Sequence, residues 1–313
     1  MRRTAWLAGI LGVMTYFAPM SPAVDQPELG RVQWGRDLKA AQAQSRATGR
    51  PILLLFQEVP GCSGCRQYGA EVLSNPLIVE AAEDLFIPVV VFNSQGGADR
   101  EILQAFKEPA FNFQVVRYLD AAGRDLIPRE EGVWSVGDTA QRMAAALRSA
   151  QRPLPRYVEA LAREGDTRAQ LTGAFAMGCF WDGEAALGGI PGVVATEAAF
   201  IDGHEAVRVT FDPREVGWAQ LVKAADAFDC AQRVYAPNAA LAGETRSAHP
   251  VAVFNAQSYR KAPESDQKHA LRSRNLRAAE LTPTQATKVN AGMAKGEIAT
   301  ARGWLSPRQA ARL

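Results

Sequence analysis

The first part of the chain alternates short apolar runs with segments of helical periodicity. Residues 52–56 are continuously apolar, which at this length is typical of a buried strand. The same pattern predicts further strands at 86–92, 114–119 and 125–127, and helices at 34–47, from 62, and at 76–84, 99–106 and 139–150. Helices that alternate with strands predict an α/β domain over residues 30–150.

The second part of the chain has a different order of elements. Residues 151–168 contain two prolines and predict a linker followed by a helix. Over residues 169–258 the pattern predicts strands at 171–177, 193–201, 205–211 and 250–254 and helices at 180–188 and 217–228. This β-α-β-β-α-β order is that of a ferredoxin-like (split βαβ) α+β domain. Residues 259–313 are polar, basic and alanine-rich, and predict a solvated helical extension that covers the second domain.

The first 23 residues have the pattern of a secretory signal peptide. Arg2 and Arg3 precede the apolar stretch 5–20, and Ser21-Pro22-Ala23 offers small residues for cleavage. An uncleaved membrane anchor is the alternative, because the apolar stretch is long. No second apolar run reaches membrane-spanning length, so we expect a periplasmic or secreted protein with no further membrane contact.

Composition and charge describe an ordinary globular protein. The chain of 313 residues, 47% hydrophobic and 22% charged, is long enough for about two domains. Its 35 basic and 33 acidic side chains become equal in number once Arg2 and Arg3 are removed with the signal peptide. A net charge near zero gives no support for nucleic-acid binding.

The pair Cys62 and Cys65 follows a predicted buried strand and begins a predicted helix. This is the geometry of a redox-active dithiol. Cys62, nearest the helix N-terminus, is expected to have the lower pKa and to attack, and Cys65 is expected to resolve the mixed disulfide. The alternatives are a structural disulfide or half of a zinc site, which needs two further ligands. The three histidines lie far away in the sequence: His204, His249 and His269.

With these features residues 30–150 resemble the thioredoxin-like family. The resemblance rests on the helix that includes Asp37, the strand 50–56, the Cys62–Cys65 motif and the hairpin 119–123. One departure concerns the cis-proline that the family places before the strand facing the dithiol. Gln114 occupies that position, and Pro109 lies five residues earlier. Either the loop is longer here or the cis-proline is absent, which bears on the docking of a substrate peptide.

A second thiol lies at another predicted strand-to-helix turn. The strand 171–177 leads into Gly178, Cys179 follows, and the helix begins with Phe180 and Trp181. The helix dipole and the unpaired backbone N–H groups of such a turn are expected to lower the pKa of Cys179. The two aromatic side chains predict a small apolar pocket beside this nucleophile.

The segments 178–193 and 203–213 resemble methionine sulfoxide reductase A. The resemblance implies that the Cys179 thiolate attacks the sulfoxide sulfur, that Phe180 and Trp181 hold the methyl group, and that Glu205 protonates the departing oxygen. The products are methionine and a sulfenic acid on Cys179. The resemblance implies no metal and no cofactor, because thiols supply the electrons. The substrate is methionine sulfoxide, in proteins or free.

The match to this family has gaps. Phe200 and Thr245 stand where the family has tyrosines, and Ala240 stands near the position of a family aspartate, so two hydrogen-bond donors to the sulfoxide are missing. Loss of such a donor costs about 10²–10³ in rate. Cys230 is either the resolving thiol for Cys179 or a small buried apolar residue.

Two polar residues near Cys179 have simpler interpretations. We expect Glu184 to be an acid that favours the helix dipole, and His204 to be an exposed turn residue.

The two thiol sites together suggest an exported peptide-methionine (S)-S-oxide reductase. Cys179 is its expected nucleophile, Cys230 its expected resolving thiol and Glu205 its expected acid, while Phe180, Trp181 and Phe200 line the pocket. The fused dithiol supplies electrons and is recharged by an upstream thiol reductase. The alternative is a thiol–disulfide oxidoreductase whose second domain is a degenerate, non-catalytic binding module. A purely structural protein with two disulfides is disfavoured by the placement of the thiols.

Overall fold

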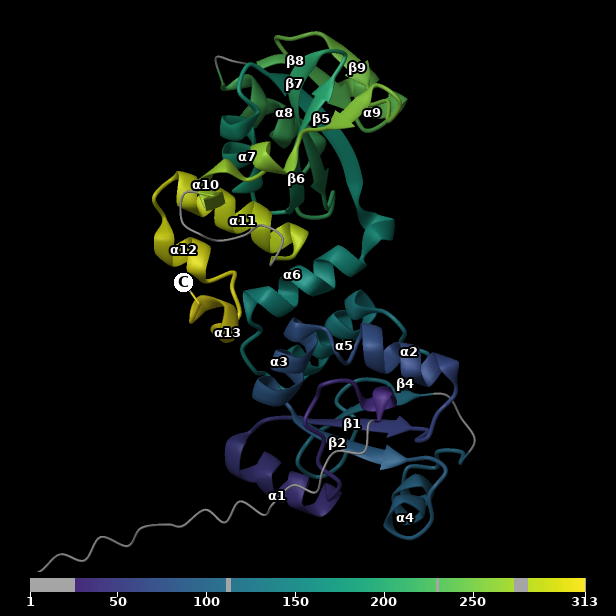
Figure 1. The fold of residues 1–313 in the computed structure, drawn as a ribbon. Helices are drawn as coiled ribbons and strands as arrows, with labels where there is room; N and C mark the ends of the chain where they lie inside the picture. Colours follow the sequence, from purple (N-terminus) through teal and green to yellow (C-terminus); the bar gives the residue numbers. More distant parts are fainter. Residues whose placement is uncertain (1–25, 111–113, 229–230, 273–280, 313) are drawn as a thin grey trace, which may run out of the picture.

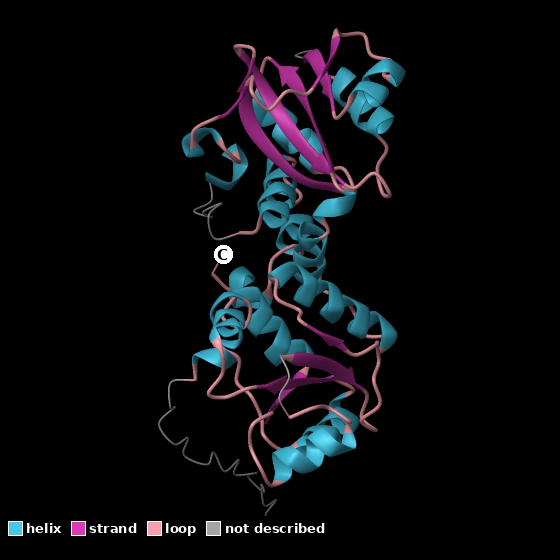
Figure 2. Ribbon diagram, turned by 90° about the vertical axis from the view of Figure 1, so that its right-hand side faces the viewer, coloured by secondary structure: helices cyan, strands magenta, loops and turns pink. Residues whose placement is uncertain are grey.

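The computed structural model describes residues 26–110, 114–228, 231–272 and 281–312. It has two lobes, each built on one sheet, with helices packed between them (Figures 1 and 2). The predicted signal peptide, residues 1–23, and Cys230 lie outside the described residues. Among the helices of the described part, none is long and apolar enough to cross a membrane.

The first lobe is an α/β layer structure around a four-stranded sheet of order β2-β1-β3-β4. The strands are β1 (Ile52–Gln57), β2 (Ile87–Phe92), β3 (Val115–Leu119) and β4 (Glu130–Glu131). Strand β1 is parallel to β2, antiparallel to β3 and buried along its whole length. The helices are α1 (Leu38–Thr48), α2 (Ser63–Glu71), α3 (Pro76–Leu85), α4 (Ala98–Ala105) and α5 (Val136–Ser149), with a 3₁₀ turn, η1 (Pro27–Leu29), ahead of them.

Both faces of this sheet are covered because β1 is apolar on both. Leu53 and Leu55 pack with residues of α3 and α5, whereas Leu54 and Phe56 pack with Leu103 of α4 on the other face. The continuous run of apolar residues at 52–56 is what burial on both faces requires.

The structure differs from the sequence analysis at several points in this lobe. Helix α1 begins after Asp37, whose side chain accepts a hydrogen bond from the Ala40 N–H, and not at Trp34. The expected strand at 125–127 is reduced to one bridge between Asp125 and Leu119. On the side of β3 away from β1, the antiparallel partner is instead the short strand β4, whose charged sequence Glu130–Glu131 does not predict a strand.

The second lobe contains a six-stranded sheet of order β10-β6-β7-β5-β8-β9. Its strands are β5 (Leu171–Met177), β6 (Val193–Ile201), β7 (His204–Phe211), β8 (Ala231–Ala236), β9 (Val251–Val253) and β10 (Tyr259–Lys261). The four antiparallel strands in the middle, β6-β7-β5-β8, have the ferredoxin-like order. Helices α7 (Phe180–Gly188) and α8 (Trp218–Asp226) cover one face, and α9 (Ala239–Glu244) follows β8.

The strand expected at 250–254 is not the one that completes the ferredoxin-like core. Strand β8 occupies that position beside β5, and β9 is an outer strand parallel to β8. Gln232 and Arg233 interrupt the apolar character of β8, so its sequence has no strand-like periodicity.

The C-terminal extension was expected to be solvated, but much of it is buried and packs against the rest of the protein. Helix α11 (Pro283–Ala294) is buried from Thr284 to Met293 and packs against α6 (Arg156–Gly165), α7 and β6. The shorter elements are η2 (Thr167–Ala169), η3 (Glu264–Asp266), α10 (His269–Arg272), α12 (Ile298–Arg302) and α13 (Pro307–Ala310). Several contacts attach this extension to the first lobe: the Ser306 Oγ donates to Glu80, 2.5 Å away, the Arg308 N–H donates to the same carboxylate, and the Arg308 guanidinium pairs with Glu83 at 2.8 Å.

Candidate functional site

The first thiol centre lies where β1 gives way to α2. Cys62 is the N-cap of α2 and is exposed, whereas Cys65 is buried within the first turn of the helix. The two sulfur atoms are 3.3 Å apart and both thiols are free. The strand and the helix therefore present one accessible sulfur, backed by one protected sulfur.

The surroundings of the two thiols separate their pKa values. Hydrogen bonds from the Cys65 backbone and thiol lower the pKa of Cys62 below its ordinary value. Burial, with the neighbouring Cys62 thiol, raises the pKa of Cys65 to about 11. Cys62 therefore ionises first, which is the order that an attack by Cys62 and a later resolution by Cys65 require.

Buried polar groups hold the loop that carries the dithiol. The Gln57 side-chain amide donates to the carbonyls of Glu28 and Cys65, at 3.0 and 3.4 Å. The Gly61 N–H donates to the Glu28 carboxylate at 2.8 Å. A Cβ added at Gly61 would lie 2.7 Å from the Cβ of Cys65 and 2.4 Å from the carbonyl oxygen of Glu58, so only glycine fits. The role of Glu28 was missed, because nothing in the sequence connects it with a loop 33 residues away.

The position facing the dithiol lacks a cis-proline. Among the peptide bonds of the described residues, Val59–Pro60 is the cis bond, and Pro109 follows a trans bond. Gln114 is buried, and its side-chain amide donates to the carbonyl of Val133 at 2.6 Å. Of the two interpretations that the sequence left open, the structure therefore favours absence of the cis-proline at this place.

The second thiol centre lies at the turn between β5 and α7. Cys179 is the N-cap of α7, has extended backbone angles and is half-buried. Burial, together with the Asp182 carboxylate, raises the pKa of Cys179, so the expected lowering is wrong. The physical reasons are that burial disfavours the charged thiolate and that a negative charge in the first helical turn opposes the thiolate that the helix dipole favours.

Glu205 lies beside this turn. It pairs with Phe200 across the β6–β7 hairpin, and its carboxylate accepts a hydrogen bond from the Phe180 N–H at 3.2 Å. The hairpin thus places a carboxylate against the residue that follows Cys179. This brings the nucleophile and the acid suggested by the sequence into one neighbourhood.

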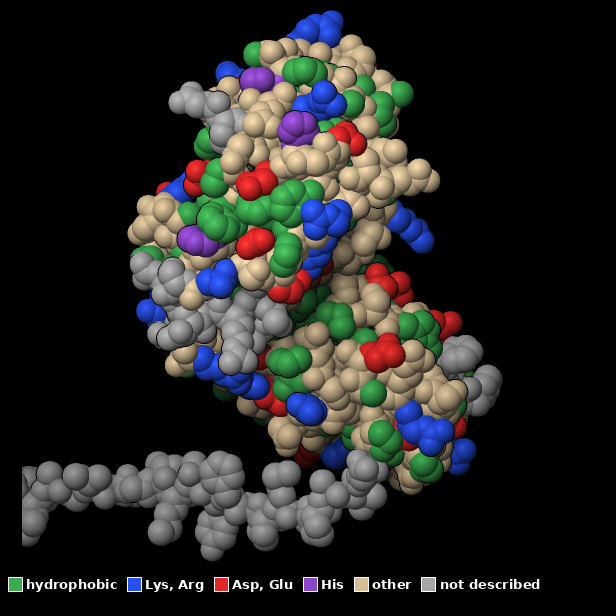
Figure 3. Space-filling view, turned by 45° about the horizontal axis from the view of Figure 1, so that its top comes forward, with side chains coloured by type: hydrophobic (Ala, Val, Ile, Leu, Met, Phe, Trp, Pro, Cys, Tyr) green, Lys and Arg blue, Asp and Glu red, His purple; other side chains and the backbone are tan. Residues whose placement is uncertain are grey.

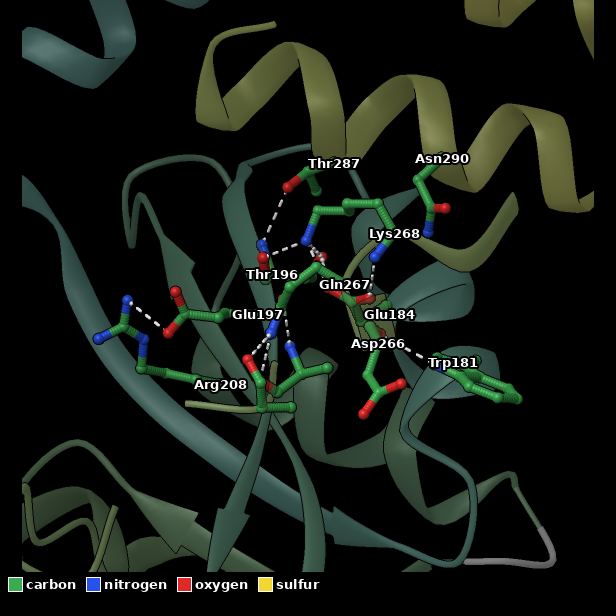
Figure 4. Close-up of polar contacts among 12 residues, drawn as sticks. Trp181, Glu184, Thr196, Glu197, Arg208, Asp266, Gln267, Lys268, Thr287 and Asn290 are labelled. Atoms are coloured by element: carbon green, nitrogen blue, oxygen red, sulfur yellow. Dashed lines mark hydrogen bonds and ion pairs between the residues drawn. The ribbon is translucent and has the colours of Figure 1, made fainter. Parts of the chain in front are cut away.

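The aromatic residues beside Cys179 pack against one another and against the C-terminal extension. Phe180 is only 5% exposed and meets the ring of Phe200 edge-on, with centroids 5.7 Å apart. Trp181 is exposed, but its ring stacks on His269 at 4.3 Å, and its N–H donates to the carbonyl of Asp266 at 2.9 Å (Figure 4). The C-terminal extension therefore occupies one face of the side chain that was expected to hold a methyl group.

Glu184 is not the acid at the helix start that we expected to favour the helix dipole. It is fully buried in α7 and forms an ion pair with Lys268, which itself reaches in from the C-terminal extension (Figure 4). The backbone N–H of Lys268 donates to the same carboxylate at 2.9 Å, and its ammonium group also donates to the carbonyl of Thr196. The extension is thereby anchored next to Trp181.

One of the two positions that the family fills with tyrosine, Thr245, is engaged elsewhere in the lobe. Thr245 accepts a hydrogen bond from the Trp218 ring N–H at 3.0 Å. Trp218 packs against Gly173, near the start of β5, whereas Cys179 follows the end of that strand. Thr245 therefore lies away from the thiol. His204 is exposed, as predicted.

Comparisons with known proteins find partial likenesses in structure only. No protein-family model matches the chain, and no curated protein matches it significantly. A solved structure titled DsbH oxidoreductase is 20% identical, covers 43% of this chain and 95% of its own, and has a TM-score of 0.32. A thioredoxin from Thermus thermophilus is 19% identical, covers 36% of this chain and 84% of its own, and has a TM-score of 0.30.

Proposed function

We propose that the protein is a thiol–disulfide oxidoreductase that works through Cys62 and Cys65. The observation that carries this proposal is the asymmetry of the pair: an exposed thiol with a lowered pKa lies 3.3 Å from a buried thiol whose pKa is about 11. The helix start beside a buried strand, held by Gln57 and Glu28, fixes this geometry.

The chemistry follows from the two pKa values. The Cys62 thiolate attacks one sulfur of a substrate disulfide, and the other substrate sulfur leaves as a thiolate. Cys65 then loses its proton and attacks the Cys62 sulfur, which releases the second substrate thiolate and forms the Cys62–Cys65 disulfide. Two electrons and two protons pass to the substrate. An upstream thiol reductase must restore the dithiol, and no other cofactor is required.

The N-terminal sequence supports the proposal that this chemistry takes place outside the cytoplasm. Arg2 and Arg3, followed by the apolar stretch 5–20, support export to the periplasm or secretion. In an oxidising compartment a dithiol stays reduced only if a partner supplies electrons, so the proposal includes such a partner.

Turnover of a disulfide-containing peptide with a chemical dithiol as electron source tests the proposal. The Cys62→Ser variant should lose turnover, and the Cys65→Ser variant should accumulate a mixed disulfide with the substrate. Cys179→Ser is the matched control and should keep wild-type turnover. Equal turnover in wild type and Cys62→Ser would disprove the proposal.

A second candidate activity is methionine sulfoxide reduction at Cys179. The contact between the Phe180 N–H and the Glu205 carboxylate favours it, because it places an acid beside the thiol. Cys179 would attack the sulfoxide sulfur, Glu205 would supply a proton to the oxygen, and methionine would leave as Cys179 becomes a sulfenic acid. Electrons from the dithiol would complete the cycle.

The second candidate has its own test, on the (S)-S-oxide of methionine, free and in a peptide. Glu205→Gln should slow the release of methionine by about 10²-fold or more, as loss of a positioned acid does. If Cys179→Ser released as much methionine as wild type, this activity would be excluded while the disulfide exchange assay stayed valid.

A further inference from the structure

The dithiol has a third potential metal ligand that the sequence analysis did not identify. One carboxylate oxygen of Glu58 and the sulfur atoms of Cys62 and Cys65 all lie within 4.8 Å of one another. The sequence alone offers this pair no further zinc ligand, because the three histidines lie far away in the chain. Glu58 follows the last residue of β1, so the strand end delivers it to the start of α2.

The loop between Glu58 and Cys62 is held in this position by the fold. The Gly61 N–H is bound by the buried Glu28 carboxylate, and the carbonyl of Cys65 is bound by the buried Gln57 amide. These contacts fix the backbone on both sides of the three side chains. Such outer contacts orient the ligands of metal sites.

We propose that the reduced Glu58–Cys62–Cys65 cluster binds a thiophilic divalent cation of the zinc class. Two thiolates and one carboxylate make up a ligand set that zinc uses, and three protein ligands leave the fourth position open. Cys62 is exposed and Glu58 is half-buried, so a cation can enter from solvent. The inference goes beyond the proposed function but uses the same thiols.

The spacing of the two sulfur atoms needs only a small adjustment. Two sulfurs at zinc distances in a tetrahedral site lie about 3.8 Å apart, and here they are 3.3 Å apart. Rotation of the exposed Cys62 side chain can increase the distance between the two sulfur atoms to the value that zinc requires. Binding one cation displaces the two thiol protons, with no change in oxidation state. The Cys62–Cys65 disulfide offers no thiolate, so only the reduced form binds.

Cobalt(II) is the probe for this site, because sulfur-to-cobalt absorption reports thiolate ligands directly. Reduced, oxygen-free full-length protein is titrated with Co²⁺, and Zn²⁺ then displaces it. The variants are Glu58→Gln and Cys62→Ser, with Glu71→Gln, an exposed glutamate of α2, as the matched control. We expect thiolate absorption in wild type and control, loss of it in Cys62→Ser, and an affinity reduced by about tenfold or more in Glu58→Gln.

Two results would overturn the inference: wild-type affinity no higher than that of free dithiothreitol, or equal affinity in wild type and Glu58→Gln. Disulfide exchange is measured in parallel with a chelator present. Retained exchange without cobalt binding rejects the metal site alone, whereas cobalt binding without exchange rejects the proposed function alone. Circular dichroism of Glu58→Gln serves as the folding control, so that a loss of cobalt affinity can be told apart from a loss of structure.

Discussion

At the scale of single residues, two cysteines in similar backbone positions have pKa values that are shifted in opposite directions. Cys62 and Cys179 are both N-caps of helices that follow a buried strand. Hydrogen-bond donors lower the pKa of Cys62, whereas burial and Asp182 raise the pKa of Cys179. The position at the start of a helix therefore does not decide the reactivity of a thiol, and its immediate neighbours do.

Replacing Asp182 with Asn should lower the pKa of Cys179. The carboxylate opposes the thiolate, so its removal increases the thiolate fraction at any pH below that pKa. The rate of alkylation of Cys179 at pH 7.5, followed by peptide mass spectrometry, should rise several-fold, as an order-of-magnitude estimate. Asp138→Asn, an exposed first-turn aspartate of α5, is the control. An unchanged rate in Asp182→Asn would show that burial alone sets the acidity.

Removal of one partner of the buried ion pair Glu184–Lys268 should lower the free energy of unfolding substantially. Lys268→Met leaves a fully buried carboxylate without its cation, which typically costs about 3–5 kcal/mol of unfolding free energy. The double variant Glu184→Gln with Lys268→Met removes the buried charge and should recover part of the loss. Urea unfolding measures both variants. Point mutations ordinarily change the free energy of unfolding by about 1 kcal/mol. A value for Lys268→Met within about 1 kcal/mol of wild type would therefore contradict this prediction.

At the scale of elements, α5 and α6 connect the lobes through a close glycine contact. A Cβ added at Gly137 would lie 2.3 Å from the Cα of Gly165, so the two backbones approach closely there. Gly137→Ala should destabilise the protein by about 1–3 kcal/mol, because the helices must separate. Gly243→Ala, in an exposed position of α9 with no atom within 4 Å of the added Cβ, is the control and should be neutral or slightly stabilising. Equal urea midpoints for both variants would contradict this packing.

Elements with one strong periodicity could be predicted from the sequence. Strands β5 and β6 and helix α7 have the predicted bounds, since each combines an apolar pattern with a glycine or proline break. Strand β8 and the burial of α11 could not be predicted. Gln232 and Arg233 break the pattern of β8, and α11 buries polar side chains such as Thr284 and Asn290, whose environment depends on distant elements.

The candidate sites were predictable to a similar extent. The pair Cys62–Cys65 can be predicted from the sequence, because residues three positions apart in a helix lie about one turn apart and on the same face. Glu28 and Glu58 became apparent only in the structure, since a 3₁₀ turn and a strand end bring them to the dithiol. The stacking of His269 on Trp181 likewise depends on the path of the C-terminal extension.

At the scale of the whole molecule, the two thiol centres belong to different lobes. Figure 1 shows α2 beside α5 in one lobe and α7 in the other, with α6 between the two lobes. The contacts of Ser306 and Arg308 with Glu80 fasten the extension of the second lobe to the first. Basic and acidic side chains are mixed over the face in Figure 3, in keeping with a formal net charge of only +2.

This arrangement predicts that any electron transfer from Cys62 to an oxidised Cys179 takes place between molecules. A mixture of Cys179→Ser, which keeps the dithiol, and Cys62→Ser, which keeps the second thiol, should then reduce methionine sulfoxide about as fast as wild type when each variant is present at the wild-type concentration. The specific rate should fall on dilution. A wild-type rate that is independent of concentration, with an inactive mixture, would show transfer within one chain.

The central claim is that Cys62 is the attacking thiol of a disulfide-exchange centre, and trapping tests it most directly. The reduced Cys65→Ser variant is mixed with an excess of oxidised peptide, quenched with acid, and mapped by mass spectrometry. The account predicts one mixed disulfide per chain, located on Cys62, because that thiol is exposed and has the lowered pKa. A mixed disulfide on Cys179, or none on Cys62, would contradict it.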